Sequence, residues 1–135
     1  MPQRHFSISV HPRELKRIRD AVDELSKPMF GKQAHLVALA VDEALANVIL
    51  HGAPKSNIDI QIDARDGRIE ARIVDDGLPH DPNAAVAVNP AERTLHRQRG
   101  GMGLGILRKV MDEIIYVRLP EKRNELRLIK YATER

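Results

Sequence analysis

The feature that most constrains this fold is an apolar segment over residues 36–50 that polar side chains interrupt at a regular spacing. Glu43, Asn47 and His51 follow one another at intervals of four residues, which stacks them one turn apart on a single face of an α-helix. The remainder of the segment suits a protein core, where polar groups without partners are costly. We therefore expect a helix from about residue 32 to residue 51. We call its three stacked polar side chains the polar stripe, and we expect a polar group or ligand to contact them.

Length and composition indicate one domain of ordinary globular character. The 135 residues are 42% hydrophobic and 30% charged, and none is cysteine, so a disulfide framework and a thiolate zinc site are excluded. The N-terminus lacks the apolar core of a signal peptide, and charged residues interrupt the longest apolar run, which argues against a membrane span. We expect a single cytoplasmic domain over residues 1–135 with no membrane partner.

The basic charge balance does not indicate a nucleic-acid-binding protein. The net charge is +3, but the four aromatic residues are too few and too scattered to form a base-stacking platform. Acidic and basic residues are interspersed along most of the chain, as they are on a solvated surface. We expect no nucleic-acid partner.

Periodicity predicts mixed secondary structure. The runs 58–64 and 69–73 alternate between apolar and polar residues around Asp66-Gly67, which is a strong hairpin signal. Further predicted elements are a strand at 4–10, an amphipathic helix from Pro12 to about Pro28, a helix at 104–111, and strands at 114–119 and 125–131 around a turn at 120–124. This order predicts an α+β fold, a two-layer sandwich of a mostly antiparallel sheet with helices on one face.

Residues 77–100 show no periodicity and contain three prolines. A loop of this length within a compact domain usually has a function. We expect it to act as a lid over the ligand, at about residues 80–99.

The helix stripe has three interpretations. A carboxylate and an amide one turn apart, Glu43 and Asn47, suit a hard cation such as Mg²⁺, which prefers oxygen ligands. Alternatively, Glu43 accepts a proton from an attacking hydroxyl group. The third interpretation is a structural stripe with no ligand.

The end of the run 69–75 carries a second polar cluster. Asp75 follows a buried strand and can accept a hydrogen bond from an amino group, while Gly77 allows the backbone to approach a flat ligand. The alternative is that Asp-Gly marks an ordinary turn after a strand.

Glycines at 100, 101, 103 and 105 open the helix predicted near the C-terminus. Their spacing matches neither a dinucleotide-binding fingerprint nor a P-loop. Glycines at a helix start nevertheless present free backbone N–H groups to an anion, and Arg93, Arg97 and Arg99 lie just upstream. A glycine-rich helix start without a bound anion is the alternative.

Together the three clusters resemble the ATP-binding domain that gyrase, histidine kinases and MutL share, known as the GHKL superfamily. Residues 43–47 resemble its N box, residues 75–77 its adenine-binding box, and residues 101–105 its second glycine box. Within the superfamily the chain is most similar to small anti-sigma-factor serine kinases of the RsbW and SpoIIAB type, through residues 76–82 and 99–104.

The resemblance implies a role for each cluster. It implies that Glu43 and Arg99 are catalytic, as general base and as the group that reaches the γ-phosphate, and that Asn47 binds Mg²⁺. Asp75 would accept the adenine amino group. The cofactor-binding residues implied for ATP are Asn47, His51, Asp75, Gly77, Gly101, Met102, Gly103 and Leu104.

The resemblance also implies a function. The expected activity is an ATP-dependent protein serine/threonine kinase that acts as an anti-sigma factor in a partner-switching system. Its expected partners are a STAS-type anti-anti-sigma protein, phosphorylated on serine, a sigma factor, and a second copy of the chain in a homodimer. The alternative is a nucleotide-gated interaction switch that binds ATP without phosphoryl transfer. Glu43 and Arg99 favour the kinase, because binding alone needs no base.

Overall fold

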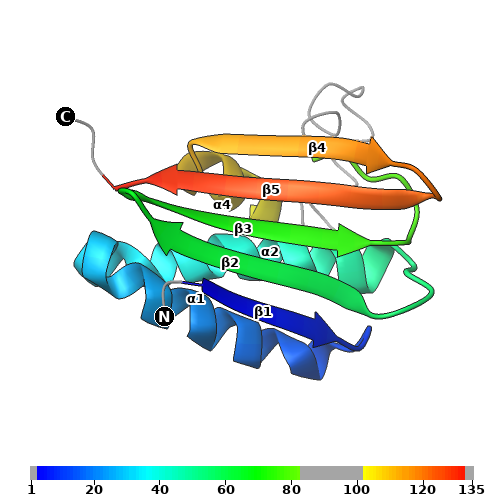
Figure 1. The fold of residues 1–135 in the computed structure, drawn as a ribbon, viewed down its shortest axis with the longest axis horizontal. Helices are drawn as coiled ribbons and strands as arrows, with labels where there is room; N and C mark the ends of the chain where they lie inside the picture. Colours follow the sequence, from blue (N-terminus) through cyan, green and yellow to red (C-terminus); the bar gives the residue numbers. More distant parts are fainter. Residues whose placement is uncertain (1–2, 83–101, 133–135) are drawn as a thin grey trace.

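The computed structural model describes residues 3–82 and 102–132 (Figure 1). The strands of these residues are β1 (Gln3–Ile8), β2 (Ile58–Arg65), β3 (Arg68–Asp75), β4 (Glu113–Leu119) and β5 (Arg123–Tyr131). They form one sheet in the order β1-β2-β3-β5-β4, and every neighbouring pair is antiparallel. The predicted antiparallel sheet is confirmed.

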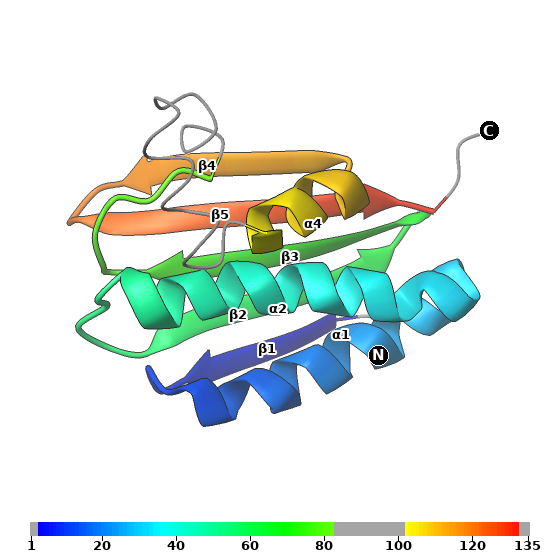
Figure 2. The ribbon, with the colours of Figure 1, turned by 180° about the vertical axis from the view of Figure 1, so that it is seen from behind.

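Helices cover one face of this sheet (Figure 2). They are α1 (Leu15–Phe30), α2 (Ala34–His51) and α4 (Met102–Val110), with short 3₁₀ turns η1 (Pro12–Glu14) and η2 (Gly31–Gln33). On the open face, cations and carboxylates form ion pairs. Arg127 of β5 contacts Glu70 of β3, and Arg72 of β3 contacts Glu125 of β5, while Arg68 contacts Glu70 within β3. The predicted α+β sandwich with helices on one face is therefore correct.

The hydrophobic core lies between the sheet and the helices, and α2 contributes more buried residues to it than α1 or α4. Small side chains on α2, including Ala40 and Ala44, are buried against the sheet and the flanking helices. By length and composition the helical stretch Pro12–His51 is apolar enough to cross a membrane, but half of its most apolar window is buried inside the fold. Burial of this kind is what a core helix requires, since its apolar residues face protein on most sides.

Several predicted boundaries differ from the structure by a few residues, among them the end of α1 and the start of β5. The first long helix does not end near Pro28 but continues to Phe30, with Pro28 inside its last turn and Gly31 (φ 56°) as its C-cap. Strand β5 begins at Arg123 rather than at residue 125, because Glu121 and Lys122 both adopt positive φ and complete the turn.

Candidate functional site

The polar stripe of α2 lies on the flank of the helix that is turned toward α4. Asp42 faces α1, where its carboxylate pairs with Arg19 at 2.9 Å. Asn47 is five residues further along and therefore lies about 140° around the helix. Since α2 packs between α1 and α4, this side is the one next to α4 (Figure 2).

The stripe consists of polar groups that the described part of the chain leaves without partners. Glu43 and Asn47 are half-buried and His51 is exposed. Within residues 3–82 and 102–132, no hydrogen bond or ion pair engages any of the three side chains. The same residues contain no group of three or more His, Cys, Asp or Glu side chains that could hold a metal ion. Asn47 as a Mg²⁺ ligand therefore remains a prediction.

Asp75 ends β3 as a buried carboxylate, 6% exposed. Its Oδ1 accepts hydrogen bonds from the backbone N–H of Gly77 at 2.7 Å and from Nδ2 of Asn124 at 3.1 Å. Both bonds engage the same oxygen, and within the described residues Oδ2 receives none. Asp75 thus combines one fixed oxygen with one that can accept a hydrogen bond from a ligand.

Gly77 is required by the fold itself. A Cβ atom at this position would lie 2.2 Å from the carbonyl oxygen of Gly52. The sequence interpretation assigned the glycine to the approach of a ligand, whereas in the structure the loop after α2 makes the close approach. The end of α2 and the end of β3 therefore meet backbone to backbone.

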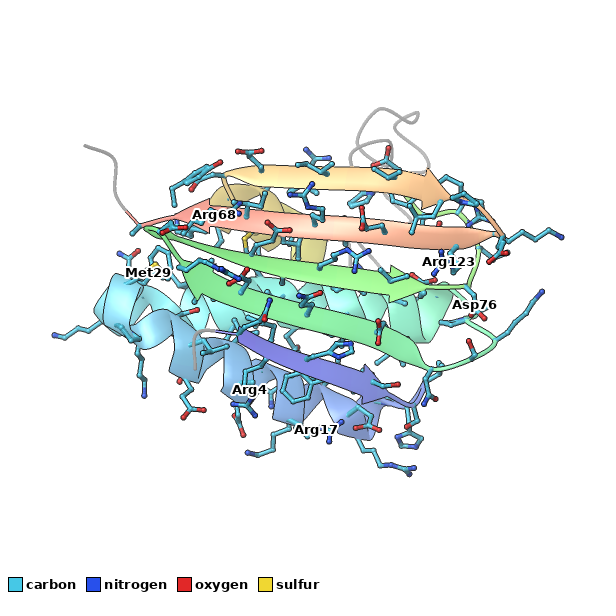
Figure 3. The ribbon with its side chains drawn as sticks, in the orientation of Figure 1. Arg4, Arg17, Met29, Arg68, Asp76 and Arg123 are labelled. Atoms are coloured by element: carbon cyan, nitrogen blue, oxygen red, sulfur yellow. The ribbon has the colours of Figure 1, made fainter. Side chains whose placement is uncertain are left out.

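Asp76 has a different role from its neighbour. Its carboxylate accepts hydrogen bonds from the Ser56 hydroxyl at 2.7 Å and from the backbone N–H groups of Lys55, at 2.7 Å, and of Ser56, at 3.2 Å. The Ser56 hydroxyl and the Lys55 N–H hold the pKa of Asp76 below its ordinary value. Figure 3 places Asp76 at the end of β3, beside the loop that connects α2 to β2. Asp76 therefore anchors this loop.

Asn124 is a residue of the site that sequence reasoning missed. It is 3% exposed, and its Nδ2 also donates to the carbonyl oxygens of Gly77, at 3.3 Å, and Leu78, at 2.9 Å. Its Oδ1 accepts hydrogen bonds from the Tyr116 hydroxyl and from Nη1 of Arg118. The available signal was periodicity, since Asn124 occupies an inward position of a strand whose next inward residues are leucines.

A small cavity of about 10 Å³ lies where these elements converge. Its lining residues are Val48, Gly52, Asp75, Leu78, His80, Tyr116, Asn124 and Leu126. This volume corresponds to about one water molecule. A flat aromatic ligand would enter only after a side chain moved, and among the lining residues Leu78 is the exposed one.

Two glycines of the cluster at 100–105 lie in α4. The helix begins at Met102, so Gly103 and Gly105 lie in its first turn and Leu104 between them. Such a turn has backbone N–H groups without partners inside the helix. Gly101, Arg93, Arg97, Arg99 and most of the expected lid at 80–99 lie outside the described residues.

Comparison with known proteins agrees with this arrangement. Residues 8–130 match a family model described as the histidine kinase-like ATPase domain. The match includes the α2 stripe, Asp75, Gly77 and the start of α4. No curated protein is detectably similar to the chain.

Proposed function

The chain belongs to the family of histidine kinase-like ATPase domains, and from this premise we propose that it is a protein-serine kinase that uses ATP and Mg²⁺. Membership makes the domain an ATP-binding domain of the GHKL type. The observation that carries the proposal is the convergence of Asp75 with the end of α2. Val48 of α2 and Gly52, the residue after the helix, line the same cavity as Asp75, and Asn47 immediately precedes Val48.

Two features of the described residues support an adenine nucleotide as the ligand. Asp75 is an acceptor with one oxygen available, which is the chemistry that an exocyclic amino group requires. The first turn of α4 offers backbone N–H groups and the positive end of a helix dipole to phosphate oxygens. The groups proposed for adenine and for the phosphates thus come from two different elements. The end of β3 contacts the residue after α2, and α4 packs beside α2.

Mg²⁺ would be held by the Asn47 side-chain oxygen together with the phosphates. When bound, the ion neutralises charge on the phosphate oxygens. Asn47 fits this role because it is half-buried and has no partner within the described residues. The proposal does not need a cluster of carboxylates, since Mg²⁺ sites in phosphoryl-transfer enzymes often use one or two protein ligands.

Glu43 is the proposed general base. Its carboxylate would accept the proton of a substrate serine while the serine oxygen forms a bond to the γ-phosphorus and the bond to the ADP oxygen breaks. Glu43 lies one turn before Asn47 on the same face of α2, so the proposed base and the proposed metal ligand are neighbours on the helix surface. Arg99 is proposed to stabilise the charge of the transferred phosphoryl group.

The proposed partners come from the resemblance to small anti-sigma-factor kinases. In this proposal the substrate is a serine of a STAS-type protein, the sequestered partner is a sigma factor, the protein works as a homodimer, and its compartment is the cytoplasm. A competing function is a switch that binds ATP without transferring phosphate. It is favoured by one observation: within the described residues, no hydrogen bond orients the Glu43 carboxylate as a base usually requires.

One experiment separates the two functions. The protein is incubated with γ-labelled ATP, Mg²⁺ and candidate STAS proteins, and labelled serine is sought in the STAS protein. Transfer that disappears when Mg²⁺ is chelated supports the kinase. ATP-dependent capture of a partner without any transfer would instead establish the switch.

A further inference from the structure

The orientation of the Asn124 side chain is fixed by its neighbours. An amide can place either its oxygen or its nitrogen toward a given partner. Arg118 has no acceptor atom, and its Nη1 lies 2.8 Å from Oδ1 of Asn124, so the oxygen must face Arg118. The Tyr116 hydroxyl donates to the same oxygen. Nδ2 must therefore point the other way, toward β3.

The acceptors on the β3 side belong to the proposed adenine site. Nδ2 donates to Oδ1 of Asp75 at 3.1 Å and to the carbonyl oxygens of Gly77 and Leu78. Because Oδ1 also accepts the Gly77 N–H, two donors from different directions set the rotation of the carboxylate. The remaining oxygen, Oδ2, is thereby held in one direction.

We propose that Asn124 is a positioning residue that sets how strongly the site distinguishes a purine with a 6-amino group from one without it. Asn124 acts through Asp75, and Arg118 acts one step further away by orienting Asn124. The inference rests on the proposed function, in which Asp75 accepts a hydrogen bond from the adenine amino group. It goes further by assigning the specificity of that contact to a residue on β5, 49 positions away along the chain.

Two variants test the series of hydrogen bonds from Arg118 through Asn124 to Asp75. Asn124→Ser replaces the amide by a hydroxyl on a shorter side chain and so withdraws the Nδ2 donor from Asp75. Arg118→Met removes the donor that fixes which end of the Asn124 amide faces β3, because the remaining Tyr116 hydroxyl can either donate to the oxygen or accept from the nitrogen. The substitution keeps an unbranched side chain at an exposed position. The matched control is Arg72→Met, because Arg72 lies on the open face of the same sheet and pairs with Glu125 rather than with the site.

The readout is the ratio of the dissociation constants for ATP and for purine riboside triphosphate, which lacks only the amino group. Calorimetry with the full chain and Mg²⁺ gives both values. Asn124→Ser should reduce the preference for ATP by about tenfold, the effect of one hydrogen bond that involves a charged group. Arg118→Met should reduce it by about threefold, and Arg72→Met should leave the ratio unchanged.

The outcomes separate this inference from the proposed function. If the unmodified protein binds ATP and transfers phosphate but does not prefer ATP over purine riboside triphosphate, the inference is wrong and the kinase survives. If the protein does not bind ATP, the proposed function fails, and the inference fails with it. A merely structural Asn124 would weaken both ligands equally at a constant ratio, which also overturns the inference. If Asn124→Ser does not fold, the test rests on Arg118→Met: a reduced preference for ATP supports the inference, and an unchanged ratio overturns it.

Discussion

The backbone N–H of Leu78 donates a hydrogen bond to the carbonyl oxygen of Gly52 at 2.7 Å. This contact joins the residue after α2 to the loop after β3, two segments that the sequence separates by the whole β2–β3 hairpin. Gly77 allows the contact, because any side chain there would occupy the position of the Gly52 carbonyl group. The stripe of α2 and the carboxylate of Asp75 are therefore held at a fixed separation by the main chain.

Gly77→Ala should destabilise the protein and weaken nucleotide binding together. The added Cβ would lie 2.2 Å from the Gly52 carbonyl oxygen, so one of the two backbone segments must shift. The expected loss in the free energy of unfolding is about 1–3 kcal/mol, the usual cost of overpacking. Urea unfolding and calorimetric titration with ATP measure the two effects.

Gly105→Ala is the matched control and should have the opposite sign. A Cβ atom at Gly105 meets no other atom within 4 Å, and the residue lies in α4. Alanine is favoured over glycine in a helix by about 0.5–1 kcal/mol, so the variant should be more stable than the unmodified protein. Equal destabilisation by both substitutions would mean that the Gly52 contact does not explain the cost at Gly77.

Asp76→Asn should lower stability at neutral pH but not in acid. The Ser56 hydroxyl and the Lys55 N–H lower the pKa of Asp76 from its ordinary 3.8, so the folded state favours the carboxylate. This contribution is fully present above the unfolded pKa and is lost as the pH falls through the folded pKa. Because water reaches the group, the difference at pH 7 should be about 1 kcal/mol, below the value for a buried charged hydrogen bond.

The measurement is the free energy of urea unfolding of both proteins between pH 7 and pH 3. Their difference should shrink as the pH falls below 3.8. Asp63→Asn serves as a control, because Asp63 makes a surface ion pair with Arg65 and anchors no loop. A difference between wild type and Asp76→Asn that stayed constant across this range would show that the charge of Asp76 contributes nothing.

Asp75→Asn should weaken ATP binding by about 1–3 kcal/mol, the range for a hydrogen bond to a charged group. The amide nitrogen would face either the adenine amino group or the two donors that now hold Oδ1. GTP should bind the unmodified protein less tightly than ATP, because its carbonyl oxygen would face a carboxylate. Calorimetry with both nucleotides is the test, and equal affinities would remove Asp75 from the recognition of adenine.

Local patterns in the sequence were sufficient for most of the fold. The Asp66-Gly67 hairpin is confirmed, with both residues at positive φ, since a turn of this type depends on two adjacent residues only. The four-residue spacing correctly placed Glu43 and Asn47 together on α2. The turn before β5 was predicted to end too late, at residue 124, because Glu121 and Lys122 carry no signal for left-handed backbone.

The site was less predictable because its contacts are distant in sequence. Periodicity shows that Asn124 faces inward but does not show that Asp75 lies opposite it on the neighbouring strand. Asp75 and Asp76 are adjacent and chemically equal, and their roles diverge only because Ser56 meets one and Asn124 the other. The different roles of two adjacent aspartates depend on tertiary packing, which no single segment of the sequence encodes.

Glu43→Gln should preserve the fold and most of the ATP affinity while it reduces phosphoryl transfer by about 10²–10⁴-fold, the usual contribution of general acid–base catalysis. The amide is nearly isosteric, and Glu43 has no partner within the described residues whose loss would destabilise α2. Asn47→Ala should instead weaken the Mg²⁺-dependent part of ATP binding, because it removes the proposed ligand. Single-turnover transfer to a confirmed STAS substrate and calorimetry with and without Mg²⁺ distinguish the two effects.

Asp42→Asn is the matched control for Glu43→Gln, because it makes the same chemical change one residue earlier on the flank that faces α1. It should cost less than about 1 kcal/mol of stability, through the partly exposed pair with Arg19, and should leave transfer intact. A general effect of charge on α2 would reduce transfer in both variants. If Glu43→Gln transfers phosphate at the normal rate, Glu43 is not the base, and its place beside Asn47 serves to orient the metal or to maintain the helix.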